Sequence, residues 1–183
     1  RFGNELDVRE YFMGRKNEIN EDRQREEEYT KLLAERIVER YHAENVVLSS
    51  HLVAYSVFEM LLHENPKLDL FGILRLPPDD YVFPFRAVEE VVEQMQETLV
   101  EWEQRGKIRL DPEIRRSAAD VVRDGVNNLG VFHAEKPLKF VKNNDIVSSN
   151  FRVLYFYHNR LENYQLDKYV HWKAEEIEVL KVD

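Results

Sequence analysis

The sequence predicts a mainly α-helical protein: a bundle of five or six helices with a small β-hairpin or wing. Apolar residues recur every three or four positions over several long segments, which is the periodicity of helices with one buried face. Runs typical of strands are short and, apart from the first few residues, lie near residues 131–141. The 183 residues suffice for one core, or for one core and a helical arm.

Residues 1–20 are expected to form the end of a domain that lies upstream. Phe2-Gly3-Asn4 is typical of a strand running into a turn, Asp7 can N-cap a short helix through Phe12, and Gly14 would break that helix. The chain starts without an initiator methionine and without the basic and apolar regions of a signal peptide. We therefore expect a segment of a longer protein, with a processed start as the alternative.

Residues 21–45 predict a long amphipathic helix that would serve as a linker arm. The first part of this segment is densely charged and has almost nothing to bury. Four apolar residues spaced by four positions form a stripe along the helix: Tyr29, Leu33, Ile37 and Tyr41. Leu32 and Val38 broaden this stripe. Without a catalytic domain to cover it, part of this stripe should stay exposed, and the arm should then self-associate.

We expect residues 46–170 to form a helical domain around one central helix. Residues 52–62 are apolar nearly all round, as in a helix at the middle of a core, and the Ser49-Ser50 pair can cap its start. Two further amphipathic helices, over residues 85–105 and 151–164, are expected to pack on this central helix.

Turn and capping residues divide the rest of the domain. Gly106 should end the helix before it, and Asp111-Pro112 should open one helix that reaches Leu129. Two short strands are expected at residues 131–133 and 138–141.

The last part of the domain carries a basic strand and a further cap. Lysines alternate with apolar residues there, as on an edge strand with one wet face, although contact with an anion is an alternative: Lys136, Lys139 and Lys142. Asn143-Asn144-Asp145 predicts a turn, and Ser149 or Asn150 can cap the last strong helix. Residues 171–183 are expected to be a frayed, weakly helical tail.

Composition and charge disfavour several classes of protein. The net charge of −9 argues against a nucleic-acid partner, which would need clustered Lys and Arg, and against simple attraction to an anionic membrane. The absence of cysteine excludes disulfides and thiolate zinc sites. No stretch approaches the roughly 20 apolar residues of a membrane span. We therefore expect a cytoplasmic location, or one at the cytoplasmic face of the membrane.

No catalytic constellation is recognisable, so we expect no catalytic residue, no metal and no cofactor in this chain. The six histidines form no His-Glu-x-x-His, and both a glycine-rich phosphate loop and Gly-x-Ser-x-Gly are missing. The aromatic residues Phe71, Tyr81, Phe83 and Phe85 are more typical of packing beneath a helix, with a membrane-touching wing as the alternative.

Three stretches carry a resemblance to a known family. Residues 1–12 (RFGNELDVREYF) resemble the strand and turn that close an acyltransferase domain. Residues 43–54 (AENVVLSSHLVA) resemble the start of the helical region that follows, and residues 140–161 resemble a passage near the end of those enzymes. From residue 1 to about residue 164 the chain thus resembles the C-terminal part of glycerol-3-phosphate and dihydroxyacetone-phosphate acyltransferases, in the phospholipid acyltransferase superfamily.

The third stretch resembles a Tyr-Tyr-Arg-Asn-Asn-x-x-His motif. Tyr157 and Asn159 match it, so the resemblance implies that these two residues contact substrate. This chain has His158-Asn159-Arg160 where the family has Arg-Asn-Asn, and Asn163 where the family has the closing His. An amide cannot replace an imidazole in proton transfer.

The resemblance implies a non-catalytic C-terminal domain of an enzyme in phospholipid biosynthesis. Such an enzyme transfers a fatty acyl group from acyl-CoA or acyl-carrier protein to glycerol 3-phosphate or a related acceptor. The family's general base and its orienting carboxylate form a His-x-x-x-x-Asp motif. No Asp stands five positions after any histidine here; the residues there are Val47, Ser56, Leu68, Leu138, Asn163 and Glu176.

The expected partners follow from this resemblance. They are an upstream acyltransferase domain of the same chain, the acyl donor and the glycerophosphate acceptor of the whole enzyme, and a peripheral membrane contact. The catalytic groups would lie upstream of residue 1, and this chain alone should be inactive.

Two other readings stay open. The short strands after a helix pair allow a free-standing helical, winged-helix-like protein-interaction module. A DNA-binding version is disfavoured by the charge and by the apolar residues 52–62, which offer no recognition face. The third reading is an enzyme with a site around Tyr157, His158 and Arg160.

Overall fold

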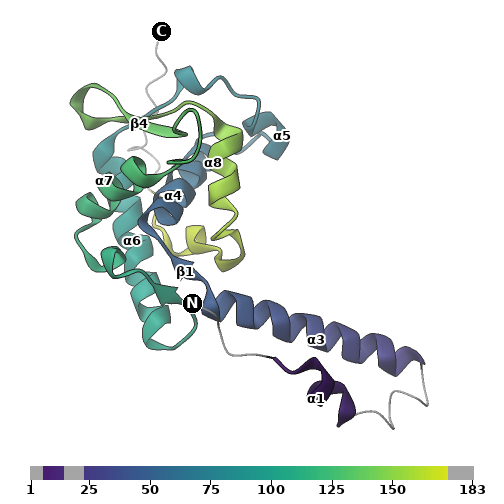
Figure 1. The fold of residues 1–183 in the computed structure, drawn as a ribbon. Helices are drawn as coiled ribbons and strands as arrows, with labels where there is room; N and C mark the ends of the chain where they lie inside the picture. Colours follow the sequence, from purple (N-terminus) through teal and green to yellow (C-terminus); the bar gives the residue numbers. More distant parts are fainter. Residues whose placement is uncertain (1–5, 15–22, 173–183) are drawn as a thin grey trace.

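The fold is built around α4 (Ser49–Glu64), a helix that is buried on almost every side. The computed structural model describes residues 6–14 and 23–172. Within them, α6 (Phe85–Gln104), α7 (Ala118–Asn128) and α8 (Phe151–His158) all contact α4 (Figure 1). The fold class expected from the sequence, mainly α with a small β-hairpin or wing, is confirmed.

Shorter elements connect and extend these helices. Among the described residues, the other α-helices are α1 (Val8–Met13), α3 (Arg23–Glu44) and α5 (Leu70–Ile73). The short 3-10 segments in the same part of the chain are η1 (Pro78–Asp80), η2 (Pro112–Arg115), η3 (Lys142–Asn144), η4 (Glu162–Tyr164) and η5 (Leu166–Tyr169).

The central position predicted for residues 52–62 is confirmed, but the cap predicted for their helix is wrong. Leu48 occupies the N-cap position and makes no side-chain capping bond, while Ser49 and Ser50 are buried in the first turn. The start of α4 lies against α7, where Gly125 closely approaches the carbonyl of Ser49. The first turn of α4 is therefore packed against α7, and its serines do not act as the solvated cap that was expected.

A three-stranded antiparallel sheet forms the wing, with the order β2-β5-β4 for β2 (Val82–Phe83), β5 (Ile146–Ser148) and β4 (Leu138–Phe140). A separate parallel pair joins β1 (Val46–Val47) to β3 (Arg109–Leu110). The edge position predicted for the lysine-bearing strand is confirmed, since β4 is at the edge and Lys139 is exposed.

The strand predicted at residues 131–133 is wrong. These residues form an exposed turn after Gly130, whose φ is +71°, and β5 takes the place of the predicted strand in the hairpin. The turn predicted at Asn143-Asn144-Asp145 joins the two true strands, because Asn143 and Asn144 both adopt a φ of 65°. Asparagine tolerates this left-handed conformation better than most residues.

The single helix predicted from Asp111 to Leu129 is in fact two. Asp111 caps only the short η2, and Ser117 starts α7 by accepting a hydrogen bond from the Asp120 amide at 3.2 Å. The buried side chain of Gln96 donates to the carbonyl oxygens of Ile114 and Arg116, which a continuous helix would have used itself. A long-range side-chain contact therefore ends the first helix.

The helix over residues 85–105 is confirmed as α6, and Gly106, with a φ of +69°, follows its last turn. Asn150 caps α8 by accepting from the amides of Arg152 and Val153, as one of the two caps expected. Helix α8 ends at His158 rather than at residue 164, because the chain turns through η4 and a left-handed Gln165.

The arm predicted at residues 21–45 is α3, which extends away from the bundle with α1 beside it (Figure 1). Part of its apolar stripe is uncovered, since Leu32, Val38 and Tyr41 are exposed whereas Leu33 is buried. Self-association through this stripe stays a prediction. The strand end at Phe2-Gly3-Asn4 and the tail from residue 173 fall outside the described residues.

Candidate functional site

A pocket of about 450 Å³ opens where the α3 arm meets the bundle. The end of α3, the residue that follows it and the chain after α8 form its wall. The lining residues are Val38, Tyr41, His42, Glu44, Asn45, Asn159, Arg160, Asn163 and Tyr164.

Hydrogen bonds across this pocket hold the arm to the bundle. The Asn45 amide donates to the Arg160 carbonyl oxygen and to the Tyr164 hydroxyl, each at 3.4 Å. The Tyr164 hydroxyl in turn donates to the His42 carbonyl oxygen at 2.9 Å. Burial raises the pKa of Tyr164, so its phenol stays protonated and remains a donor at neutral pH.

The pocket is suited to binding a polar or anionic group. Asn159, Arg160 and Asn163 supply amide and guanidinium donors at its exposed side. The carboxylate of Glu44 is engaged by Arg109 at 2.7 Å, on the side of β3, which offsets its charge.

The two residues inferred from the family motif lie apart. Asn159 lines the pocket at the base of α3. Tyr157 lies on the neighbouring surface, where its hydroxyl is 3.1 Å from Nε2 of His133. They are two positions apart at the end of α8, so the helix directs them to different sides, and only Asn159 belongs to the pocket.

The structure does not bring together the side chains of the alternative site, Tyr157, His158 and Arg160, either. His158 points into the core and is only 2% exposed, with Nε2 2.6 Å from Oε1 of Glu59. Its ring stacks on Tyr55 at 4.6 Å and on Tyr155 at 5.5 Å. The side chains of Tyr157 and Arg160 lie elsewhere, as described above.

A second cavity of about 310 Å³ lies beside this buried histidine and was not expected from the sequence. Tyr55 donates to Oδ1 of Asp167 at 2.9 Å within it. Burial, followed by the negative charges of Glu59 and Asp167, raises the pKa of Tyr55 well above its usual value. The signal available in the sequence was Glu59 itself, a carboxylate inside the apolar run of residues 52–62.

His51 is a further histidine with a perturbed environment. Its Nδ1 is buried and has no hydrogen-bond partner among the described residues. Burial, with a smaller contribution from the positive charge of Arg160, lowers the pKa of His51 from 6.5 to about 4. The imidazole is therefore neutral at physiological pH.

This lowered pKa predicts a loss of stability on mild acidification. The unfolded chain takes up the proton near pH 6.5 and the folded chain only near pH 4, so the free energy of unfolding should fall as the pH drops through this range. The full loss is roughly 3 kcal/mol, at about 1.4 kcal/mol per pKa unit. Urea unfolding at pH 7 and at pH 4.5 measures it.

His51→Gln should reduce this pH dependence, whereas the control His171→Gln, at an exposed position, should leave it unchanged. An unaltered pH dependence in His51→Gln would show that other groups are responsible.

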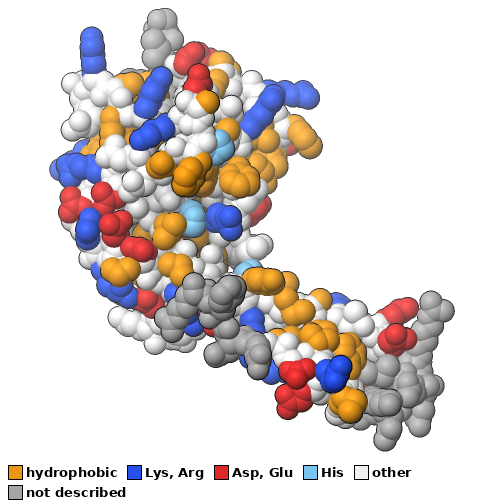
Figure 2. Space-filling model, viewed as in Figure 1, with side chains coloured by type: hydrophobic (Ala, Val, Ile, Leu, Met, Phe, Trp, Pro, Cys, Tyr) orange, Lys and Arg blue, Asp and Glu red, His pale blue; other side chains and the backbone are white. Residues whose placement is uncertain are grey.

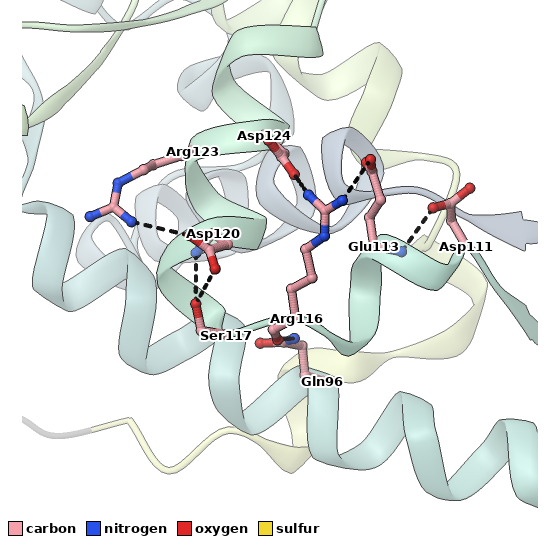
Figure 3. Close-up of polar contacts among 8 residues, drawn as sticks. All are labelled: Gln96, Asp111, Glu113, Arg116, Ser117, Asp120, Arg123 and Asp124. Atoms are coloured by element: carbon pink, nitrogen blue, oxygen red, sulfur yellow. Dashed lines mark hydrogen bonds and ion pairs between the residues drawn. The ribbon is translucent and has the colours of Figure 1, made fainter.

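The exposed side of α7 carries a network of paired charges (Figure 3). Arg116 contacts Asp124 at 2.9 Å and Glu113 at 3.6 Å, and Arg123 contacts Asp120 at 3.4 Å. With their charges offset by neighbouring carboxylates, these arginines are poor candidates for binding phosphate groups.

Geometry and comparison together define the chain only at the level of its architecture: a mainly helical domain with a small antiparallel sheet and a polar pocket at the base of a helical arm. No protein-family model matches the chain, and comparisons with curated proteins and with solved structures likewise found no match. Among the described residues, no group of three or more His, Cys, Asp or Glu side chains is placed to hold a metal ion. None of the helices in residues 6–14 and 23–172 has the length and apolar character needed to cross a bilayer.

Proposed function

We propose that this chain is the non-catalytic C-terminal region of a glycerophosphate acyltransferase. The whole enzyme would transfer a fatty acyl group from an acyl thioester to glycerol 3-phosphate or a related acceptor. The region would pack on the upstream catalytic domain and shape its acceptor or acyl pocket.

One observation carries this proposal: two of the stretches that resemble the family meet in one pocket. Asn45 belongs to the second stretch and Arg160 to the third, and they are 115 positions apart in the chain. The hydrogen bond between them closes the wall that Asn159 also lines. Motif residues from distant segments that assemble at one place are expected when the motif serves a shared site.

The position of the pocket fits this role. It lies at the C-terminal end of α3, and along the chain this helix follows residues 1–20, the segment expected to close the upstream domain. The uncovered apolar residues of α3 would then be covered by that domain, because exposed apolar helix faces commonly mark contact surfaces.

The test is an acyltransferase assay with glycerol 3-phosphate and a long-chain acyl thioester. We expect the full reading frame to be active and this chain alone to be inactive. In the full-length enzyme, Asn45→Ala and Asn159→Ala should each lower kcat/KM by about tenfold, the effect of losing roughly 1.4 kcal/mol of hydrogen bonding.

Asn128→Ala, an exposed position at the end of α7, is the matched control and should keep full activity. Thermal melting of each variant separates loss of activity from loss of the fold. An inactive full reading frame, or unchanged kcat/KM in both pocket variants, would contradict the proposal.

A second candidate is the winged-helix-like protein-interaction module, which the sheet order favours. Apart from the short α5, β3 and 3-10 segments, the elements run α4, β2, α6, α7, β4 and β5, and the strand between α4 and α6 pairs with β5. This candidate predicts no acyltransferase activity in the full reading frame. The same assay therefore decides between the two.

A further inference from the structure

Residues 130–160 carry a charge opposite to that of the chain as a whole. They contain five cations, Lys136, Lys139, Lys142, Arg152 and Arg160, against two carboxylates, Glu135 and Asp145, for a net charge of +3. The whole chain has a net charge of −9. The turn after α7, the β4–β5 hairpin and α8 thus form a positive segment on an acidic protein.

The five cations also differ from other basic residues in their surroundings. None of them makes an ion pair with another residue of the described chain, whereas Arg116, just before α7, and Arg123, on α7, are held by carboxylates (Figure 3). Lys136 donates to the Asn127 carbonyl oxygen, and the positive charges of the other four remain available to a ligand.

Large apolar side chains accompany these cations. Phe132 is 100% exposed, Val131 is 59% exposed and Phe156 is 57% exposed. On α8 the exposed residues Arg152 and Phe156 are four positions apart, so they lie along one side of the helix axis. Exposed aromatic residues of this kind are unusual unless they contact something.

The two parts of this surface are joined. Nε2 of His133, the residue after Phe132, lies 3.1 Å from the Tyr157 hydroxyl. The ring centroids of Tyr157 and Phe156 are 5.3 Å apart. Figure 2 shows hydrophobic side chains bordered by Lys and Arg over β4 and α8. We name this surface the basic aromatic face: Val131, Phe132, Lys139, Arg152 and Phe156.

We propose that the basic aromatic face binds the surface of an anionic phospholipid bilayer. Lysine and arginine side chains near such a surface are attracted to its negative headgroups, and aromatic side chains insert at the level of the headgroups. The charge of the face complements the lipid, although the net charge of the protein opposes it. A bilayer engages apolar rings and unpaired cations together, which is the combination found here.

The resemblance implies a peripheral membrane contact without placing it, and this inference goes beyond that expectation by assigning the contact to named residues. The vesicle test below needs no acyltransferase domain, so it can fail or succeed independently of the proposed function. The basic aromatic face also differs from the membrane-touching group of aromatic residues considered in the sequence, because two members of that group, Tyr81 and Phe83, are buried in the core.

The test is sedimentation of the purified chain with vesicles. Vesicles of equal parts phosphatidylglycerol and phosphatidylcholine should bind the chain at least tenfold more tightly than phosphatidylcholine alone, and added salt should weaken this binding. Phe132→Ser/Phe156→Ser and Lys139→Glu/Arg152→Glu should each lower binding to the anionic vesicles by about tenfold or more.

Tyr41→Ser is the matched control, because Tyr41 is an exposed aromatic residue on α3, away from the face. It should bind as the unaltered chain does, and circular dichroism should show all variants folded. Equal binding to both kinds of vesicle, or unchanged binding of the two double variants, would overturn the proposal. Phe132- and Phe156-dependent dimerisation without lipid binding in analytical ultracentrifugation would also overturn it, in favour of a second copy.

Discussion

Gly125→Ala should destabilise the fold by about 2–3 kcal/mol, because α4 and α7 leave no room for a methyl group between them. A Cβ at this position would lie 2.7 Å from Val53 Cβ and 2.8 Å from the carbonyl oxygen of Ser49. Rotation about χ1 would move the Val53 methyl groups but not its Cβ, and the Ser49 oxygen is backbone, so one helix has to shift. Helix propensity alone would favour alanine by about 1 kcal/mol, and the steric cost outweighs it.

Urea unfolding monitored by circular dichroism measures this change. Gly14→Ala is the matched control: its new Cβ would come no closer than 3.9 Å to the Glu10 carbonyl oxygen, and the effect should stay within about 0.5 kcal/mol. A Gly125→Ala variant as stable as the unaltered chain would contradict the close α4–α7 contact.

His158→Ala should lower the free energy of unfolding by about 3 kcal/mol, through two losses at one position. The ring would no longer fill the space between Tyr55 and Tyr155. Glu59, whose side chain is 14% exposed, would also lose its 2.6 Å partner inside the bundle. An unpaired, largely buried carboxylate is costly because little water can replace the lost contact.

A double-mutant cycle with Glu59→Ala isolates the contact itself. We expect a coupling energy of about 1.5–3 kcal/mol between the two positions, typical of a hydrogen bond to a charged group. His171→Ala, at an exposed site, should be neutral. A coupling energy near zero would mean that the two side chains stabilise the fold independently.

The helices of this fold could be predicted because their signals are local. Residues 52–62 are apolar on nearly every side, and residues 85–105 carry one apolar face with Gly106 after them; both became the helices expected. The break between η2 and α7 could not be predicted in this way. It depends on Gln96, a residue of another helix, which binds carbonyls that the chain near Arg116 leaves free.

The strand error has a similar cause. Residues 131–133 have the composition of a strand, yet β4 pairs with residues 146–148, because the two positive-φ asparagines return the chain there. Composition indicates which segments can be strands, whereas the turn determines which of them pair.

The sites were predicted less well than the fold, because their contacts join residues distant in the chain. Asn159 was inferred from a family motif and does line a pocket. Asn45, which lines the same pocket and bonds to Arg160, is more than a hundred positions away in the chain. The Glu59–His158 contact joins residues 99 positions apart, and in the sequence Glu59 is one carboxylate within an apolar run. Spacing along one sequence cannot identify such pairs.

The central proposal, that this region is an essential non-catalytic part of an acyltransferase, is tested most directly by deletion. The measurement is the acyltransferase activity of the full reading frame with and without the region from Val46 onward, at equal amounts of folded protein. The proposal predicts activity in the intact enzyme and its loss on deletion. Full activity without the region, or no activity in either protein, would contradict it.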